Sequence, residues 1–137
     1  MRKYVGFVLI LLCCVSCQTT QQRLLDSGTS QVQLRSIQTR VFDTRDKAKG
    51  LRTVIATLQD LDFVIDDADD VLGAVSATKL NRYALRITVT VRPREERQLL
   101  VRASIQYGNK PVHDSETYQQ FFISLEKAMF LTAHQVD

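Results

Sequence analysis

Two runs of alternating apolar and polar residues constrain the fold of this chain more than any other feature. The first run covers residues 85–92, the second covers 99–107, and the polar loop 93–97 joins them. Their apolar members are Leu85, Ile87, Val89 and Val91, followed by Leu99, Val101, Ala103, Ile105 and Tyr107. A two-residue period is typical of a β-strand with one buried face and one face in water. The sequence therefore predicts two antiparallel strands in a sheet that has one wet face.

Two segments with helical periodicity flank this pair of strands. Asp43 or Thr44 is expected to cap the first segment, and Asp46 suits its first turn. The apolar face of this segment consists of Ala48, Leu51, Val54, Ile55, Leu58 and Leu61. The second segment follows a cap at Asp114 or Ser115. Its apolar face consists of Tyr118, Phe121, Phe122, Leu125, Met129 and Ala133. Both patterns predict amphipathic helices.

Shorter signals complete the order of the elements. Residues 34–42 and 63–65 are rich in strand formers, and a strand resumes over 71–79, with a bulge expected at Gly73. The acidic residues 66–70 predict a turn between the last two of these strands. Two helices pack naturally on one face of an antiparallel sheet. The predicted fold is therefore an α+β two-layer sandwich, with the element order β-α-β-β-β-β-α.

The N-terminal residues have the layout of a bacterial secretory signal. Arg2 and Lys3 precede an apolar stretch over 5–15, and Ser16 and Cys17 follow it. This stretch is too short to span a bilayer comfortably, since a transmembrane helix takes about 20 residues. A basic start, a short apolar core and a small residue before the cleavage site predict export of the chain and removal of the segment.

The series Cys14-Val15-Ser16-Cys17 resembles the lipobox of bacterial lipoproteins, although leucine is usual where Cys14 stands. The resemblance implies cleavage before Cys17 and attachment of diacylglycerol to its thiol, with a further acyl chain such as palmitate on its amino group. Several acyl chains anchor a protein far more firmly than one chain does. Gln18, in place of aspartate, implies sorting to the outer membrane. The alternatives are an ordinary secreted protein and an uncleaved anchor.

Processing at this site would divide the chain into a signal peptide at 1–16, a flexible tether at 17–31 and a single domain at 32–137. The tether is rich in Gln, Thr and Ser, a composition that does not form a packed core. Loss of Arg2 and Lys3 leaves sixteen basic residues against fifteen acidic ones, so the mature chain is almost neutral. A balanced charge and an exported chain both argue against binding to nucleic acid.

Several stretches resemble a family of small bacterial lipoproteins of unassigned function, over most of residues 35–135. They are QTRVFDT at 38–44, VIATLQDL at 54–61, FVID at 63–66, LGAVSATK at 72–79, and YQQFF at 118–122 with Phe130 and Leu131. The element order is also similar to the helix-grip domains of the BamC lipoprotein of the outer-membrane protein assembly machine. Both resemblances imply an accessory or scaffold role in an envelope complex, and neither supplies a catalytic residue.

The densest cluster of charge is acidic. It consists of Asp60, Asp62, Asp66, Asp67, Asp69 and Asp70. Clustered carboxylates suit Ca²⁺, but this spacing lacks the alternate acids, the central glycine and the terminal glutamate of a calcium loop. We interpret the cluster as a solvated turn and predict no metal site.

No other pattern predicts catalysis. The two histidines, His113 and His134, have no companion at helical spacing. No serine stands in a Gly-x-Ser-x-Gly context, and the sequence has no glycine-rich phosphate loop. With Cys17 as the sole cysteine after processing, neither a disulfide framework nor a Cys-based metal site can form. We expect a protein that is not an enzyme and that takes no cofactor.

Three outward-facing arginines and one aromatic residue are the candidates for partner binding. Arg86, Arg92 and Arg102 fall at the polar positions of the two alternating runs. They suit an acidic partner or an anionic lipid head group, while the alternative is a solvated sheet face whose charges discourage aggregation. Phe130 belongs to an aromatic excess in the last helix, which either fills the core or marks a partner surface.

Two functions remain open. The first is an accessory or scaffold protein, anchored by lipid to the outer membrane and facing the periplasm, in a complex for secretion, efflux or outer-membrane assembly. The alternative is a carrier or sensor that holds a small ligand or lipid between sheet and helices. An aliphatic cavity would favour the carrier, and an exposed apolar or arginine-rich patch would favour the accessory protein. The sequence leaves the partner and the oligomeric state open.

Overall fold

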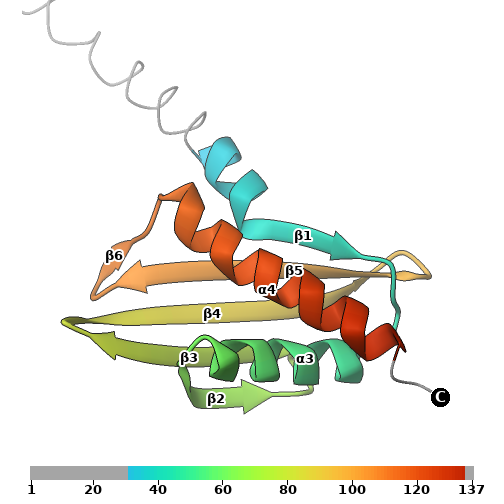
Figure 1. The fold of residues 1–137 in the computed structure, drawn as a ribbon. Coiled ribbons are helices and arrows are strands. Elements are labelled where there is room, and N and C mark those ends of the chain that lie inside the picture. The colour runs from blue at the N-terminus through green and yellow to red at the C-terminus, as the bar shows by residue number, and fades with distance from the viewer. Residues whose placement is uncertain (1–30, 135–137) are drawn as a thin grey trace, which may run out of the picture. The chain divides into compact units, whose positions relative to one another are not determined.

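The computed structural model describes residues 31–134, which begin with a helical stretch over 31–38 (Figure 1). The elements that follow are β1 (Thr39–Phe42), α3 (Lys47–Asp60), β2 (Val64–Asp69), β3 (Ala74–Asn81), β4 (Tyr83–Arg94), β5 (Gln98–Tyr107), β6 (Lys110–Pro111) and α4 (Ser115–His134). The chain divides into two units, Met1–Leu34 and Arg35–Asp137, and these elements all belong to the second. The predicted α+β sandwich is confirmed, and the short β6 adds one strand to the predicted order.

The sheet is antiparallel throughout, with the strand order β1-β5-β4-β3-β2 and with β6 paired to the other end of β5. The predicted pair of alternating strands is its centre, with Leu85 opposite Tyr107 and Arg94 opposite Gln98. The connecting loop is shorter than predicted, because Pro93 and Arg94 still belong to β4. Proline is tolerated there because β3 begins only at Ala74, opposite Thr90, so the stretch of β4 beyond Thr90 pairs with β5 alone.

Both helices pack on the same face of the sheet, in front of it in Figure 1. The buried residues of β4 and β5 are Ile87, Val89, Val91, Leu99, Val101, Ala103 and Ile105, which face Leu51, Val54 and Leu58 of α3 and Tyr118, Phe121, Phe122 and Leu125 of α4. The α3 face differs from the prediction at Ala48, which is exposed. Thr53 and Thr57 are buried instead, because their hydroxyls donate to the carbonyls of Lys49 and Thr53 within the helix.

The predicted strand over 34–42 is correct only from Thr39 onward, because residues 31–38 are helical. Leu34 and Ile37 are half-buried, and their three-residue spacing suits a helix. Gln38 ends this helix, and its side chain is almost fully buried. The sequence alone did not reveal this change of structure within one run of strand formers.

The prediction of an acidic turn over 66–70 is wrong, since β2 continues to Asp69 and the turn covers 70–73. The predicted bulge also lies elsewhere, between Ile65 and Asp67 of β2. Gly73 has a φ of 69°, a left-handed conformation, which ends the turn just before β3 begins. Because β2 is an edge strand, its acids and its bulge both discourage pairing with another sheet.

Aspartates cap both helices. At α3 the cap is Asp46, whose side chain accepts a 2.9 Å hydrogen bond from the Lys49 N–H, so the prediction of a cap at Asp43 or Thr44 is wrong. At α4 the cap is Asp114, one of the two predicted alternatives. Its carboxylate accepts hydrogen bonds from the N–H groups of Glu116 and Thr117 and from the Thr117 hydroxyl. These bonds fix where each helix begins.

Candidate functional site

The face of the sheet opposite the helices is the strongest candidate for a binding surface. Arg86, Arg92 and Arg102 are exposed, whereas their chain neighbours Ile87, Val91, Val101 and Ala103 are buried under the helices. Since successive side chains of a strand point to opposite faces, all three arginines project from the open face. The structure therefore brings together three of the four residues singled out from the sequence.

Small hydroxyl side chains fill the space between these arginines. The pairing of β3, β4 and β5 sets Ser76, Thr88 and Ser104 in one row across the sheet. In the neighbouring row, Thr90 lies opposite Arg102. A shallow cavity of about 340 Å³ on this face is lined by Thr88, Thr90, Arg92, Leu100, Arg102 and Ser104. The open face thus has positively charged arginines around a centre of short, polar side chains.

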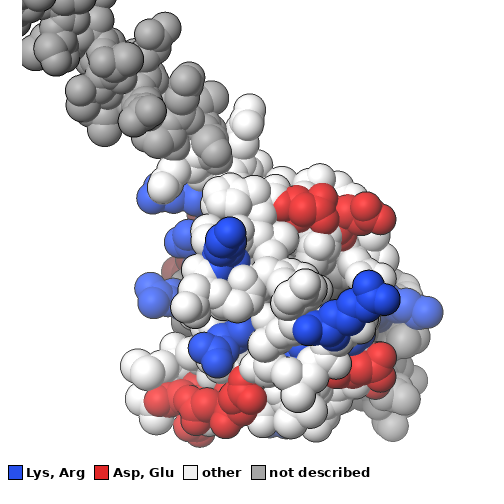
Figure 2. Space-filling model, turned by 90° about the vertical axis from the view of Figure 1, so that its left-hand side faces the viewer, with Lys and Arg blue, Asp and Glu red and all other residues white. Residues whose placement is uncertain are grey.

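Acidic side chains border the same face along β2. Asp67 pairs with Ser76 and Asp69 pairs with Ala74, and directly paired residues share a face of the sheet. Asp66 accepts a 2.6 Å hydrogen bond from the Thr78 hydroxyl. In Figure 2 several basic side chains line the left side of the domain, and one group of acidic side chains lies at its lower end, the height at which Figure 1 shows β2, while another lies near the top. The sequence did not predict this border, because the pairing of β2 with β3 creates it.

Arg102 is the open-face arginine with a bonding partner inside the domain. Its Nη2 lies 3.4 Å from Oε1 of Gln38, and Nε2 of Gln38 donates to the Tyr118 hydroxyl at 3.1 Å. The buried Tyr118 hydroxyl also accepts from the Ile105 N–H and donates to the Val112 carbonyl, each at 3.1 Å. This network holds the start of β1 and the centre of β5 to α4, and it limits the motion of Arg102.

The ion pairs of the part of the chain that the structure describes lie away from the open face. Arg40 is 3.7 Å from Glu126 of α4, and its guanidinium lies 4.9 Å from the ring centre of Phe122. Lys79 is 3.6 Å from Asp62. The charges of Arg86 and Arg92 are thus not neutralised by any acid between residues 31 and 134.

Phe130 does not join the arginines, because it belongs to the helical layer on the other side of the sheet. It is 62% exposed and borders a cavity of about 350 Å³ near the end of α4, together with Phe42, Gly50 and Met129. Most of the aromatic excess in this helix belongs to the core, as Phe121 and Phe122 are buried. Phe130 is therefore a separate exposed site.

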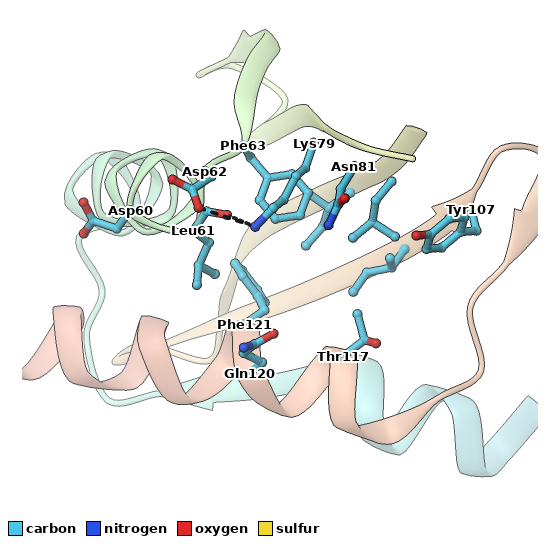
Figure 3. Close-up of a pocket in the computed structure, with 13 residues that line it drawn as sticks. Asp60, Leu61, Asp62, Phe63, Lys79, Asn81, Tyr107, Thr117, Gln120 and Phe121 are labelled. Atoms are coloured by element: carbon cyan, nitrogen blue, oxygen red, sulfur yellow. Dashed lines mark hydrogen bonds and ion pairs between the residues drawn. The ribbon is translucent and has the colours of Figure 1, made fainter. Parts of the chain in front are cut away.

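A cleft lies between the sheet and the helices, and the sequence did not predict which residues line it (Figure 3). It has a volume of about 420 Å³ and lies between the end of α3, strands β3 to β5 and the start of α4. Its floor is apolar, but Ile87, Ile105 and Phe121 are already buried by packing. At its mouth, Lys79 donates a 2.9 Å hydrogen bond to the Leu61 carbonyl and points toward Asp62, as Figure 3 shows. The cleft has an apolar floor and a polar rim.

The acidic residues do not form a compact cage. Among residues 31–134, no three His, Cys, Asp or Glu side chains are close enough together to hold a metal ion. The acidic residues of β2 are spread along an edge strand. His113 is exposed in the connection before α4. The described residues thus offer surfaces for binding and no compact group of metal ligands.

Comparisons with protein-family models and with curated proteins gave no match for this chain. The resemblance to small lipoproteins therefore stays a prediction. Cys17, the candidate for lipid attachment, lies outside the described residues, as do the predicted signal peptide and most of the tether. Within residues 31–134, no helix is long and apolar enough to cross a membrane.

Proposed function

We propose that this chain is a non-enzymatic accessory protein of a bacterial envelope complex, anchored to the outer membrane by lipid on Cys17. The proposal places its domain in the periplasm, where it binds protein through the open face of the sheet. The observation that supports it most directly is the uncovered face with Arg86, Arg92 and Arg102 around a row of Ser and Thr side chains.

A protein partner suits this surface better than a small ligand. Arginine is enriched at protein interfaces because its planar guanidinium forms two parallel hydrogen bonds and stacks on apolar groups. The side chains of Thr88, Thr90 and Ser104 are short, so another protein surface can approach the sheet closely. Tethering to the membrane raises the local concentration of the domain, so a modest intrinsic affinity is sufficient.

The lipid anchor is tested by fractionating cells that express the full chain with Cys17→Ala. We expect the wild-type protein in the membrane fraction and the variant in the soluble periplasmic fraction, since loss of the thiol removes the site of acylation. Cys13→Ala is the matched control, because it changes a cysteine of the signal that lies outside the lipobox-like series and leaves the attachment site intact. Membrane association of the Cys17→Ala protein at the wild-type level would contradict the anchor.

The docking surface is tested by photo-cross-linking in intact cells. A photoreactive amino acid at Thr88 samples the open face, and the same amino acid at Arg52 samples the exposed side of α3. We expect mass spectrometry to identify envelope proteins attached at Thr88 and absent at Arg52. Equal products from both positions would show that the open face is not the binding surface.

The carrier function is the second candidate, and the cleft of about 420 Å³ favours it. This volume lies within the range of small-ligand sites. Extraction of the purified full-length protein with organic solvent tests the idea, with mass spectrometry of the extract. A carrier would release one compound in stoichiometric amount, and Thr117→Trp, which narrows the cleft, would abolish its recovery. An extract without such a compound would eliminate this function.

A further inference from the structure

The open face carries opposite charges on opposite sides, and the pairing of its strands fixes how they are aligned. Asp69 of β2 lies opposite Ala74, Ala74 lies opposite Thr90, and Thr90 lies opposite Arg102. These four residues form one straight row across four strands. Arg86 lies in another row, opposite Thr78, whose hydroxyl donates to Asp66.

The charges at the two ends of the first row are too far apart to pair within one chain. Neighbouring strands are about 4.8 Å apart, so Arg102 and Asp69 are separated by roughly 14 Å of sheet. Asp69 accepts a hydrogen bond from the Leu72 N–H, and Arg102 approaches Gln38. Neither has an ionic partner among the described residues.

We infer that this face binds a second copy of the same chain. A two-fold axis that runs parallel to the strands, between β3 and β4, turns one sheet face onto the other. It places β5 over β2 of the second copy and β4 over β3, and it preserves position along the strands. Arg102 then faces Asp69 of the second copy, and Arg86 faces the Thr78–Asp66 pair of the second copy. The two-fold symmetry forms each contact twice.

The centre of the face suits such packing. Ala74, Ser76, Thr88 and Thr90 surround the proposed axis, and their side chains are small. Packed sheets lie about 10 Å apart with their strands roughly aligned, which is the arrangement that this axis produces. Small residues at the centre and arginines toward the rim therefore allow contact without burying an unpaired charge.

The size of the face indicates a weak dimer in dilute solution. Four strands span about 19 Å, and about six residues along each strand span about 20 Å. The resulting face of about 400 Å² is smaller than the roughly 800 Å² per partner of a stable complex. Confinement to a membrane offsets this deficit by raising the local concentration. The inference rests on the proposed function in that it takes the open face as a docking surface.

Reversal of charge on one side at a time tests the inference. Full-length chains with two different affinity tags are co-expressed, cross-linked in intact cells with an amine-reactive reagent, solubilised in detergent and purified by one tag. Arg102→Glu in both copies sets Glu against Asp69, and Asp69→Lys in both copies sets Lys against Arg102. We expect recovery of the second tag to be lost in each case, because like charges meet twice.

The mixed pair is the decisive measurement. When one copy carries Arg102→Glu and the other carries Asp69→Lys, both contacts again join opposite charges, and we expect recovery of the second tag. A damaged fold cannot produce this rescue.

Arg52→Glu on the exposed side of α3 is the matched control and should self-associate like the wild type. Loss in the mixed pair, or unchanged recovery in both single variants, would overturn the inference. Cross-links from Thr88 to other envelope proteins, without a second copy, would overturn it and leave the proposed function standing.

Discussion

At the scale of single residues, the Tyr118 hydroxyl is the most consequential atom of the domain. It accepts hydrogen bonds from the Gln38 side chain and the Ile105 N–H, and it donates to the Val112 carbonyl. Gln38 lies 80 residues from Tyr118 in the sequence, whereas Ile105 and Val112 belong to the strand and the connection that precede α4. The hydroxyl therefore completes two buried hydrogen bonds and one part-buried one, and it joins the beginning of the domain to its sheet and to α4.

Tyr118→Phe is expected to lower the free energy of unfolding by about 1–3 kcal/mol, because it leaves buried donors without an acceptor. Urea denaturation of the full-length protein in detergent measures the change. Tyr83→Phe is the matched control. Tyr83 is 68% exposed, and its ring contact with Tyr107 does not need the hydroxyl. We expect the control to remain within about 0.5 kcal/mol of the wild type. Equal effects of the two substitutions would refute the role of the Tyr118 network.

At the scale of elements, local sequence determined the centre of the fold and long-range pairing determined its margins. Alternation over 85–92 and 99–107 predicted the central strands, since the polarity of each of these residues indicates which face of the sheet it occupies. The helix over 31–38 and the extent of β2 were not predictable in this way. Their conformations depend on contacts such as that of Gln38 with Tyr118 and on the pairing of β2 with β3.

The candidate site likewise has a part that local sequence predicted and a part that depends on long-range pairing. The outward direction of Arg86, Arg92 and Arg102 followed from alternation, which is local. The acidic border required the register in which Asp69 lies opposite Ala74, and no short stretch of sequence contains that information. The cleft likewise assembles residues from α3, three strands and α4. Sequence analysis therefore predicted the three outward-facing arginines but neither the acidic border of the open face nor the cleft between the layers.

The start of α4 provides a prediction on pH. The Thr117 hydroxyl, followed by the N–H groups of Thr117 and Glu116, lowers the pKa of Asp114 below its usual value of 3.8. A carboxyl with a lowered pKa in the folded state stabilises the fold above its unfolded pKa, and this contribution is lost as the pH falls through the folded pKa. Asp114→Asn keeps an acceptor at the cap but has no charge to lose.

We expect the wild type to have a higher melting temperature than Asp114→Asn near neutral pH, and the difference to shrink between about pH 5 and pH 2. Melting curves of both full-length proteins across this range measure it. Asp70→Asn, at an exposed position in the turn before β3, is the control and should show no such trend. A difference that stays constant down to the lowest pH would show that the Asp114 charge does not stabilise α4.

At the scale of the whole molecule, the association that we propose depends on the distribution of charge. The sheet ends at β2, an edge strand whose outer backbone groups would accept another strand. Asp66 and Asp67 occupy this edge, at the irregularity that follows Ile65. Charges and a bulge are the usual means by which proteins keep sheet edges from pairing indiscriminately. The same acids border the open face, so one strand both prevents edge-to-edge pairing and takes part in the proposed contact between faces.

The double substitution Asp66→Thr and Asp67→Thr is therefore expected to make the full-length protein aggregate. Two strand-forming residues would replace two charges at an exposed edge, and pairing of edges between molecules would no longer be opposed. Light scattering during heating, at matched protein and detergent concentrations, should rise at a lower temperature than in the wild type. Glu95→Asn and Glu96→Thr together are the control, since they change the net charge equally in the turn between β4 and β5, and asparagine tolerates the φ of 53° at Glu95. If both proteins aggregate alike, net charge protects the molecule, and the position of the acids on β2 does not.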